Sequence, residues 1–244
     1  ERPDPAGIFA PGQLLLLDRR GRGRERDHRP RPQRERLHRR AHGVGEVVPG
    51  GEALPLIVAC ADDDAIDSNE AARRAYLGLD GSVAKSLTLG FAGFNAASSA
   101  NIPPQMTTGL AAGTLTITGQ VDQGASANKE MRLYVGMVDY DDGPFVINED
   151  GDAISIQYDT DAATATQPYL HLALRDIPSG TFTGELTGTY HLTGAIEGDA
   201  TLNLTMSGLL MDDGNGGTVR RPESTTITGT ASSGDGVFEV ALML

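Results

Sequence analysis

From about residue 86 onward, apolar and polar residues alternate along nine short segments of the chain. Such alternation is typical of strands that bury one face of an antiparallel sheet. The segments are SLTLGF (86–91), GTLTITGQV (113–121), MRLYVGMV (131–138), AISIQYD (153–159), YLHLALRD (169–176), GTYHLTGAI (188–196), TLNLTMSGL (201–209), TTITGTA (225–231) and VFEVALML (237–244). They predict an all-β domain over residues 86–244, with about eight to nine antiparallel strands in a sandwich or a flattened barrel.

The same alternation predicts which side chains form the core. Within each segment, the apolar residues that share one face are expected to point inward, while Thr and Ser on the other face meet water. The predicted core residues are Leu115, Ile117, Leu133, Val135, Ile154, Ile156, Leu170, Leu172, Leu174, Tyr190, Leu192, Leu202, Leu204, Met206, Ile227, Phe238, Val240 and Leu242.

The β region contains an internal duplication. The matching pairs are 113–121 with 188–196, Asp-Asp-Gly at 141–143 with the same tripeptide at 212–214, and YLHLAL at 169–174 with VFEVAL at 237–242. They indicate two copies of a four-stranded unit, at about residues 113–176 and 188–244. Because one such unit leaves its apolar face exposed, the copies are expected to pack face to face or to close round each other.

One helix is predicted before the strands, within residues 61–85. The stretch ADDDAIDSNEA begins as an acidic tether. Ser68 is a good N-cap, EAARRAYLGL follows it, and Gly78 or Gly81 can end the helix. Residues 61–85 are therefore interpreted as an acidic tether that leads into a short helix.

The first 51 residues do not have the composition of a folded domain. DRRGRGRERDHRPRPQRERLHRR, at 18–40, is rich in Arg, Pro and Gly and has no apolar period, so it buries too little surface to offset the entropy of ordering. We interpret 1–51 as a disordered segment from a mis-called start, since the chain begins with Glu. The alternative is a basic arm that binds nucleic acid.

Residues 52–60 end at Cys60, the only cysteine of the chain. Ile57-Val58-Ala59-Cys60 resembles a bacterial lipobox, in which a short apolar run and a small residue precede a lipid-modified cysteine. The segment predicts a truncated signal peptide and a membrane anchor of acyl chains on Cys60. The alternative is a free cysteine buried on a short strand.

The two parts of the chain differ in net charge. Residues 1–59 hold 12 arginines and 8 acids, whereas residues 60–244 hold 8 Lys and Arg against 25 acids, a net charge of −17. A domain with this much negative charge repels phosphate backbones. We therefore expect no nucleic-acid partner for residues 60–244.

Two acidic turns are the candidate metal site. Asp139, Asp141 and Asp142 lie in DYDDG, and Glu149, Asp150 and Asp152 follow in NEDGD. Calcium takes six to eight oxygen ligands from loops of this kind. Asp and Gly are also ordinary turn residues, so a solvated turn without any cofactor is the competing interpretation.

Two common catalytic motifs are missing from the sequence, since it contains neither G-x-S-x-G nor H-E-x-x-H. His171 and His191 each alternate with leucines and are expected to face solvent. We therefore predict a protein that is not an enzyme and has no catalytic residues.

The stretch AARRAYLGLDGSVAKSLTLGFAGFNAASSANIPP, with the GTLTITGQVDQGAS and GTYHLTGAIEGDATLNLTMSG strands after it, resembles lipid-anchored, uncharacterised envelope lipoproteins of myxobacteria and their relatives. The resemblance covers roughly residues 54–244. It implies export to the cell envelope, and Ala61 after Cys60 favours the outer membrane.

Two functions follow as hypotheses. The first is a non-enzymatic envelope lipoprotein whose β-domain binds a protein partner or has a structural role. The second is a carrier that encloses a small apolar ligand in a cavity between the two copies. A tightly packed core favours the first function, and a large apolar pocket favours the second.

Overall fold

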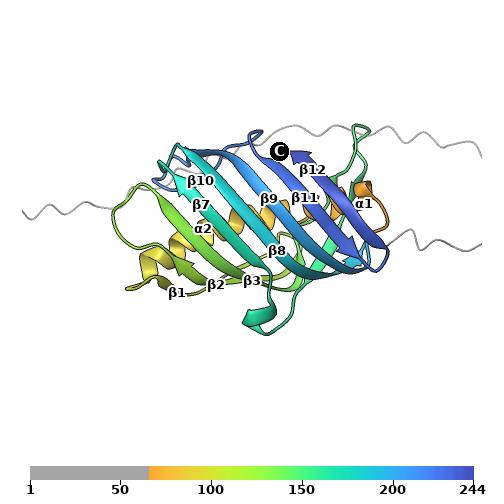
Figure 1. Ribbon diagram of the computed structural model, residues 1–244, viewed down its shortest axis with the longest axis horizontal. Coiled ribbons are helices and arrows are strands. Elements are labelled where there is room, and N and C mark those ends of the chain that lie inside the picture. Colours follow the sequence, from red (N-terminus) through yellow and green to blue (C-terminus); the bar gives the residue numbers. More distant parts are fainter. Residues whose placement is uncertain (1–65) are drawn as a thin grey trace, which may run out of the picture. The chain divides into compact units, whose positions relative to one another are not determined.

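The computed structural model describes residues 66–244, which form two helices followed by a large antiparallel sheet (Figure 1). The helices are α1 (Asn69–Leu77) and α2 (Asp80–Ala96), and a short 3-10 helix η1 (Thr164–Thr166) lies between strands. The strands are β1 (Asn101–Thr108), β2 (Ala112–Val121), β3 (Lys129–Asp141), β4 (Phe145–Val146), β5 (Ala153–Ile154), β6 (Ile156–Asp159), β7 (Tyr169–Arg175), β8 (Thr181–Gly194), β9 (Gly198–Asp212), β10 (Thr218–Arg220), β11 (Thr226–Ser233) and β12 (Gly236–Met243). Residues 1–51 and the segment with Cys60 lie outside the described residues, so their interpretations stay predictions.

Ten of these strands form one sheet, in the order β1-β2-β3-β6-β8-β9-β11-β12. Strands β6 and β7 lie one after the other between β3 and β8, and each pairs with both of these long strands. Strand β10 pairs with the end of β9. All the pairs are antiparallel, so the predicted fold class is confirmed. The two predicted copies lie edge to edge, because β6 and β7 both pair with β8. The sheet is a single layer whose end strands, β1 and β12, do not pair with each other within the described residues.

The duplicated landmarks have the same local geometry. Each long hairpin, β2–β3 and β8–β9, leads to an Asp-Asp-Gly turn in which the first carboxylate accepts a hydrogen bond from the glycine N–H. The distance is 2.6 Å from Gly143 to Asp141 and 2.6 Å from Gly214 to Asp212. The match between YLHLAL and VFEVAL is wrong in the sheet. Strand β7 pairs with β3 as β11 pairs with β9, so YLHLAL corresponds to TTITGTA.

The helical region is longer than the sequence predicts. Ser68 caps α1 by accepting a hydrogen bond from the N–H of Ala71 at 3.2 Å, and α1 ends at Gly78, as expected. The strand predicted at 86–91 is wrong, because this segment lies inside α2. The boundary at residue 85 is therefore corrected, and the strands begin at Asn101.

Helix α2 lies behind the sheet in Figure 1 and packs against β1, β2, β3 and β10. The side of the helix that faces the sheet consists mostly of small residues, which allow a close approach. The buried residues of α2 are Ser82, Val83, Ser86, Leu87, Gly90 and Gly93. A Cβ at Gly93 would lie only 2.9 Å from the Cβ of Ile102 on β1. Tertiary packing thus stabilises a helix that its own glycines disfavour.

The hydrophobic core lies between the sheet and the two helices. All the predicted core residues are buried except Ile154, Phe238 and Leu242, which are half-buried and pack against the core. The helices add Tyr76, Leu79, Val83 and Leu87 from the other side. Within the described part of the chain, neither helix has the length and apolar character needed to cross a membrane.

The beginning of the described chain is bonded to the last hairpin of the sheet. The hydroxyl of Ser233 donates to the carbonyl of Ile66 at 2.6 Å, and the N–H of Glu239 donates to the side chain of Asn69 at 2.8 Å. Helix α1 also packs against β12. The first and last elements of the domain therefore support each other.

Candidate functional site

The acidic turns place their side chains in separate local hydrogen bonds. Asp139 accepts from Gln157, Asp141 accepts from Ser155 and Gly143, and Asp152 accepts from Asn148. Such bonds within and next to a turn are the ordinary role of aspartate in loops.

The remaining acids of these turns are divided between solvent and the body of the domain. Glu149 and Asp150 are exposed, whereas Asp142 is bonded to Lys85 of α2. Among residues 66–244, no three His, Cys, Asp or Glu side chains come together in a way that could hold a metal ion. The geometry therefore gives no support to the calcium hypothesis.

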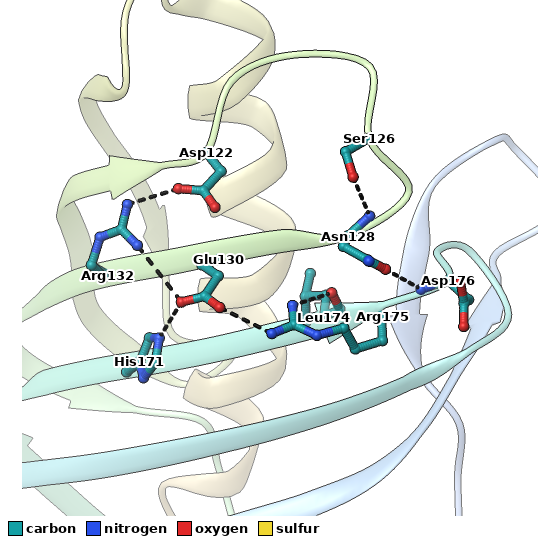
Figure 2. A network of polar contacts seen from close by, with 9 residues as sticks. All are labelled: Asp122, Ser126, Asn128, Glu130, Arg132, His171, Leu174, Arg175 and Asp176. Carbon is teal, nitrogen blue, oxygen red and sulfur yellow. Dashed lines mark hydrogen bonds and ion pairs between the residues drawn. The ribbon is translucent and has the colours of Figure 1, made fainter.

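A network of charged residues lies on the face of the sheet away from α2, and Figure 2 shows it. Glu130 on β3 accepts from His171 at 3.1 Å and from Arg175 at 3.0 Å, both on β7. Arg132 reaches Asp122 at 2.8 Å, in the loop after β2, and lies 3.8 Å from the Glu130 carboxylate. The charges of this network thus neutralise one another.

The network joins the β2–β3 hairpin to β7. Hydrogen bonds from Arg175, then from His171, lower the pKa of the Glu130 carboxyl below its ordinary value, so it is ionised at neutral pH. Two residues before Glu130, the side chain of Asn128 accepts a hydrogen bond from the N–H of Asp176 at 3.0 Å (Figure 2). Each contact satisfies groups of the protein itself, so we assign the network a structural role.

The two histidines of the β region both contact carboxylates near the surface. His171 is half-buried against Glu130, and His191 lies 2.6 Å from Asp199 and 3.6 Å from Asp161. The hydrogen bond to Asp199 raises the pKa of His191 above its ordinary value. His171 and His191 occupy β7 and β8, and each has its own separate partners.

A cleft opens along the side of α2 that the sheet leaves uncovered. Its volume is about 440 Å³, and we call it the α2 cleft. Strand β1 borders it on one side, and β10 with the residues that follow borders it on the other. The lining residues are Asp80, Ala84, Lys85, Thr88, Leu89, Thr107, Val219, Arg220, Arg221, Pro222, Thr225 and Leu244.

A partly buried ion pair fixes one end of the α2 cleft. Arg220 of β10 binds Asp80 with two hydrogen bonds, at 2.7 and 2.8 Å, and Tyr76 donates to the same carboxylate at 3.0 Å. Burial, then the negative charge of Asp80, raises the pKa of Tyr76, so its hydroxyl stays protonated and donates. Burial alone lowers the pKa of Arg220, but Asp80 outweighs it and raises that pKa.

A second cluster of the same kind joins α2 to the end of β3. Lys85 binds Asp142 and also donates to the carbonyl of Thr108 at 3.1 Å. Tyr140 donates to Asp142 at 2.6 Å, and burial followed by this hydrogen bond raises the pKa of Tyr140. Asp142, a candidate calcium ligand, thus anchors α2 beside the cleft.

Sequence reasoning missed the α2 cleft, because its walls come from segments that are distant in the chain. The 8 Lys and Arg of residues 66–244 include two adjacent pairs, Arg73–Arg74 and Arg220–Arg221, and only the second pair lines the cleft. The sequence alone does not distinguish these two pairs.

Comparisons with known proteins found no matching family, no matching curated protein and no matching solved structure. Functional inference for this chain therefore rests on the geometry and chemistry of its own residues.

Proposed function

We propose that residues 66–244 form a non-enzymatic binding domain that takes a small, largely apolar molecule into the α2 cleft. The observation that carries the proposal is the cleft itself. Its volume of about 440 Å³ falls within the range of about 300–1,000 Å³ that is usual for small-molecule sites.

The composition of the lining supports a small ligand. Ala84 and Leu89 supply apolar surface from α2, and Val219, Pro222 and Leu244 supply it from the opposite wall. The lining also includes polar and charged residues, which in small-molecule sites fix the orientation of the ligand. The buried side chains of the helices and the sheet form one hydrophobic cluster, so we place the ligand in the cleft at the edge of the domain and not between the duplicated units.

The proposal places this domain at the cell envelope. Cys60 in its lipobox-like context is the attachment point for lipid, and the acidic residues that follow act as a tether. A carrier held in this way would bind apolar molecules close to the outer membrane. This part of the proposal rests on the sequence alone.

A neutral apolar dye tests binding in the cleft. We expect saturable fluorescence enhancement when N-phenyl-1-naphthylamine is titrated into the full chain. Ala84→Trp fills the cleft and is expected to weaken binding by about tenfold or more, since the bulky ring occupies the ligand volume. Ala92→Trp is the matched control, because Ala92 is an exposed residue of the same helix outside the cleft.

Circular dichroism of both variants establishes that they are folded. Equal dye affinities of Ala84→Trp and Ala92→Trp would show that the dye binds outside the cleft. Absence of saturable binding to the unsubstituted protein would end the carrier proposal.

A further inference from the structure

The α2 cleft concentrates positive charge on a negative domain. Residues 66–244 contain 8 Lys and Arg and 22 Asp and Glu. Three of those 8 cations, Lys85, Arg220 and Arg221, line the cleft, and Asp80 is the only acid among its lining residues. The lining therefore carries a net charge of +2, opposite in sign to the domain that surrounds it.

Two of the three cations are already bound to carboxylates. Arg220 is held by Asp80, and its side chain is only 11% exposed. Lys85 is held by Asp142, which also accepts hydrogen bonds from Tyr140 and from the N–H of Leu110. Their positive charges are thereby offset within the domain.

Arg221 differs from both. Its side chain is exposed, and no carboxylate within residues 66–244 pairs with it. Its backbone is nevertheless fixed, because its N–H donates to Leu209 at 2.8 Å and its carbonyl accepts from Ser224 at 2.6 Å. A guanidinium on a fixed backbone at the rim of an apolar cleft is well placed to bind an anionic group.

We propose that the ligand of the α2 cleft is a single-chain anionic amphiphile, whose apolar chain lies in the cleft and whose carboxylate or phosphate head binds Arg221. This inference rests on the proposed binding function and adds the chemical class of the ligand. Head and chain are recognised by different parts of the site. Arg221 supplies charge-assisted hydrogen bonds, and Ala84, Leu89 and Val219 supply apolar contact.

Matched ligands and variants test the proposal by isothermal titration calorimetry on the full chain. Decanoate is expected to bind about tenfold more tightly than decan-1-ol, which has the same chain without the charge. Arg221→Gln is expected to remove most of this difference and to leave decan-1-ol affinity unchanged. Arg175→Gln is the control, because Arg175 is a surface arginine bonded to Glu130 and lies outside the cleft.

Decyl phosphate distinguishes the two sources of such a head group. Tighter binding of decyl phosphate than of decanoate assigns a phospholipid-derived ligand, and the reverse assigns a free fatty acid. Equal binding of decanoate and decan-1-ol, or full retention of the difference in Arg221→Gln, would overturn the anionic head group while leaving the carrier function standing. If neither decanoate nor decan-1-ol binds, it is the carrier function that fails.

Discussion

Asp80 and Asp142 hold the elements around the α2 cleft in place. Each carboxylate accepts hydrogen bonds from a tyrosine and from a cation on another element. The two arrangements bring charge into a partly buried region, where the carboxylate and its partners depend on one another. Both contacts join α2 or its neighbour α1 to the sheet, so they act on the shape of the cleft as well as on stability.

Exposed ion pairs on α1 provide a contrast to these contacts. Glu70 binds Arg73 at 2.7 Å and Arg74 at 2.8 Å, and its side chain is 46% exposed. Hydrogen bonds from Arg73 outweigh burial and, with those from Arg74, lower the pKa of Glu70 from 4.5 to about 2. Its stabilising contribution is therefore present at pH 7 and is lost as the pH falls from 4.5 through about 2.

Loss of Asp80 is expected to cost more stability than loss of Glu70. Asp80→Ala leaves the guanidinium of Arg220 partly buried and unpaired, so the free energy of unfolding at pH 7 should fall by about 3 kcal/mol. Glu70→Ala should lower it by at most about 1 kcal/mol, because solvent screens that exposed pair. Urea denaturation measures both values. If the two losses are equal, the Asp80–Arg220 pair has no special role in stability.

At the scale of the element, α2 owes its position to small side chains. Gly90 and Gly93 lower its intrinsic helix propensity, yet they let the helix axis approach β1 and β3. The nearest atoms to a Cβ at Gly90 belong to Met131 on β3, and those to a Cβ at Gly93 belong to Ile102 on β1. Helix propensity and packing therefore make opposite predictions for a substitution at Gly93.

Gly93→Ala is expected to destabilise the protein by about 1 kcal/mol. Alanine gains about 1 kcal/mol of helix propensity, but overpacking against Ile102 costs about 1–3 kcal/mol. Urea denaturation of a double-mutant cycle with Ile102→Gly, which removes the Cβ of Ile102, measures the contact itself. In the Ile102→Gly background, Gly93→Ala should become neutral or stabilising. A stabilising effect of Gly93→Ala in the unsubstituted protein would show that α2 is not seated closely on β1.

The helix α2 also shows which features of the chain could be predicted and which could not. Strands such as 113–121 were predictable, because their inward residues are large and alternate regularly. In α2, Leu87, Leu89 and Phe91 also alternate, which favours a strand. The helical period is carried by Ser82, Ser86, Gly90 and Gly93, which a hydrophobic pattern does not register.

The α2 cleft was unpredictable for a different reason. Asp80 and Arg220 are 140 residues apart, and only the folded topology brings them together. The acidic turns, by contrast, were prominent in the sequence but use their carboxylates for local hydrogen bonds. The abundant acids thus marked turns, whereas the rare cations did not single out the cleft, because Arg73 and Arg74 form a similar pair on α1.

At the scale of the whole molecule, the proposal combines a lipid attachment point with a binding domain. Cys60 lies six residues before Ile66, where the described chain begins. A short tether would keep the α2 cleft near the membrane surface, where apolar molecules are concentrated. Acidic residues at 62–64 and the negative charge of the domain would favour contact with solvent over contact with anionic lipid.

Lipid attachment at Cys60 is testable in a bacterial host that exports lipoproteins. Cells supplied with an alkyne-bearing fatty acid are expected to label the unsubstituted protein, because acyl chains are added to a lipobox cysteine. Cys60→Ser should take up no label. Equal expression of both proteins is the control, measured by immunoblot. An unlabelled wild-type protein would rule out the anchor.

The hydrogen bonds of Ser233 to Ile66 and of Glu239 to Asn69 determine how the domain responds to mechanical force. A pull applied upstream of Ile66 reaches these two bonds before it reaches the rest of the sheet. They connect to the β11–β12 hairpin, and β12 is an edge strand, paired on one side only by β11 within the described residues. Tension on an envelope tether would therefore load the last hairpin first, at the wall that also carries Leu244 into the cleft.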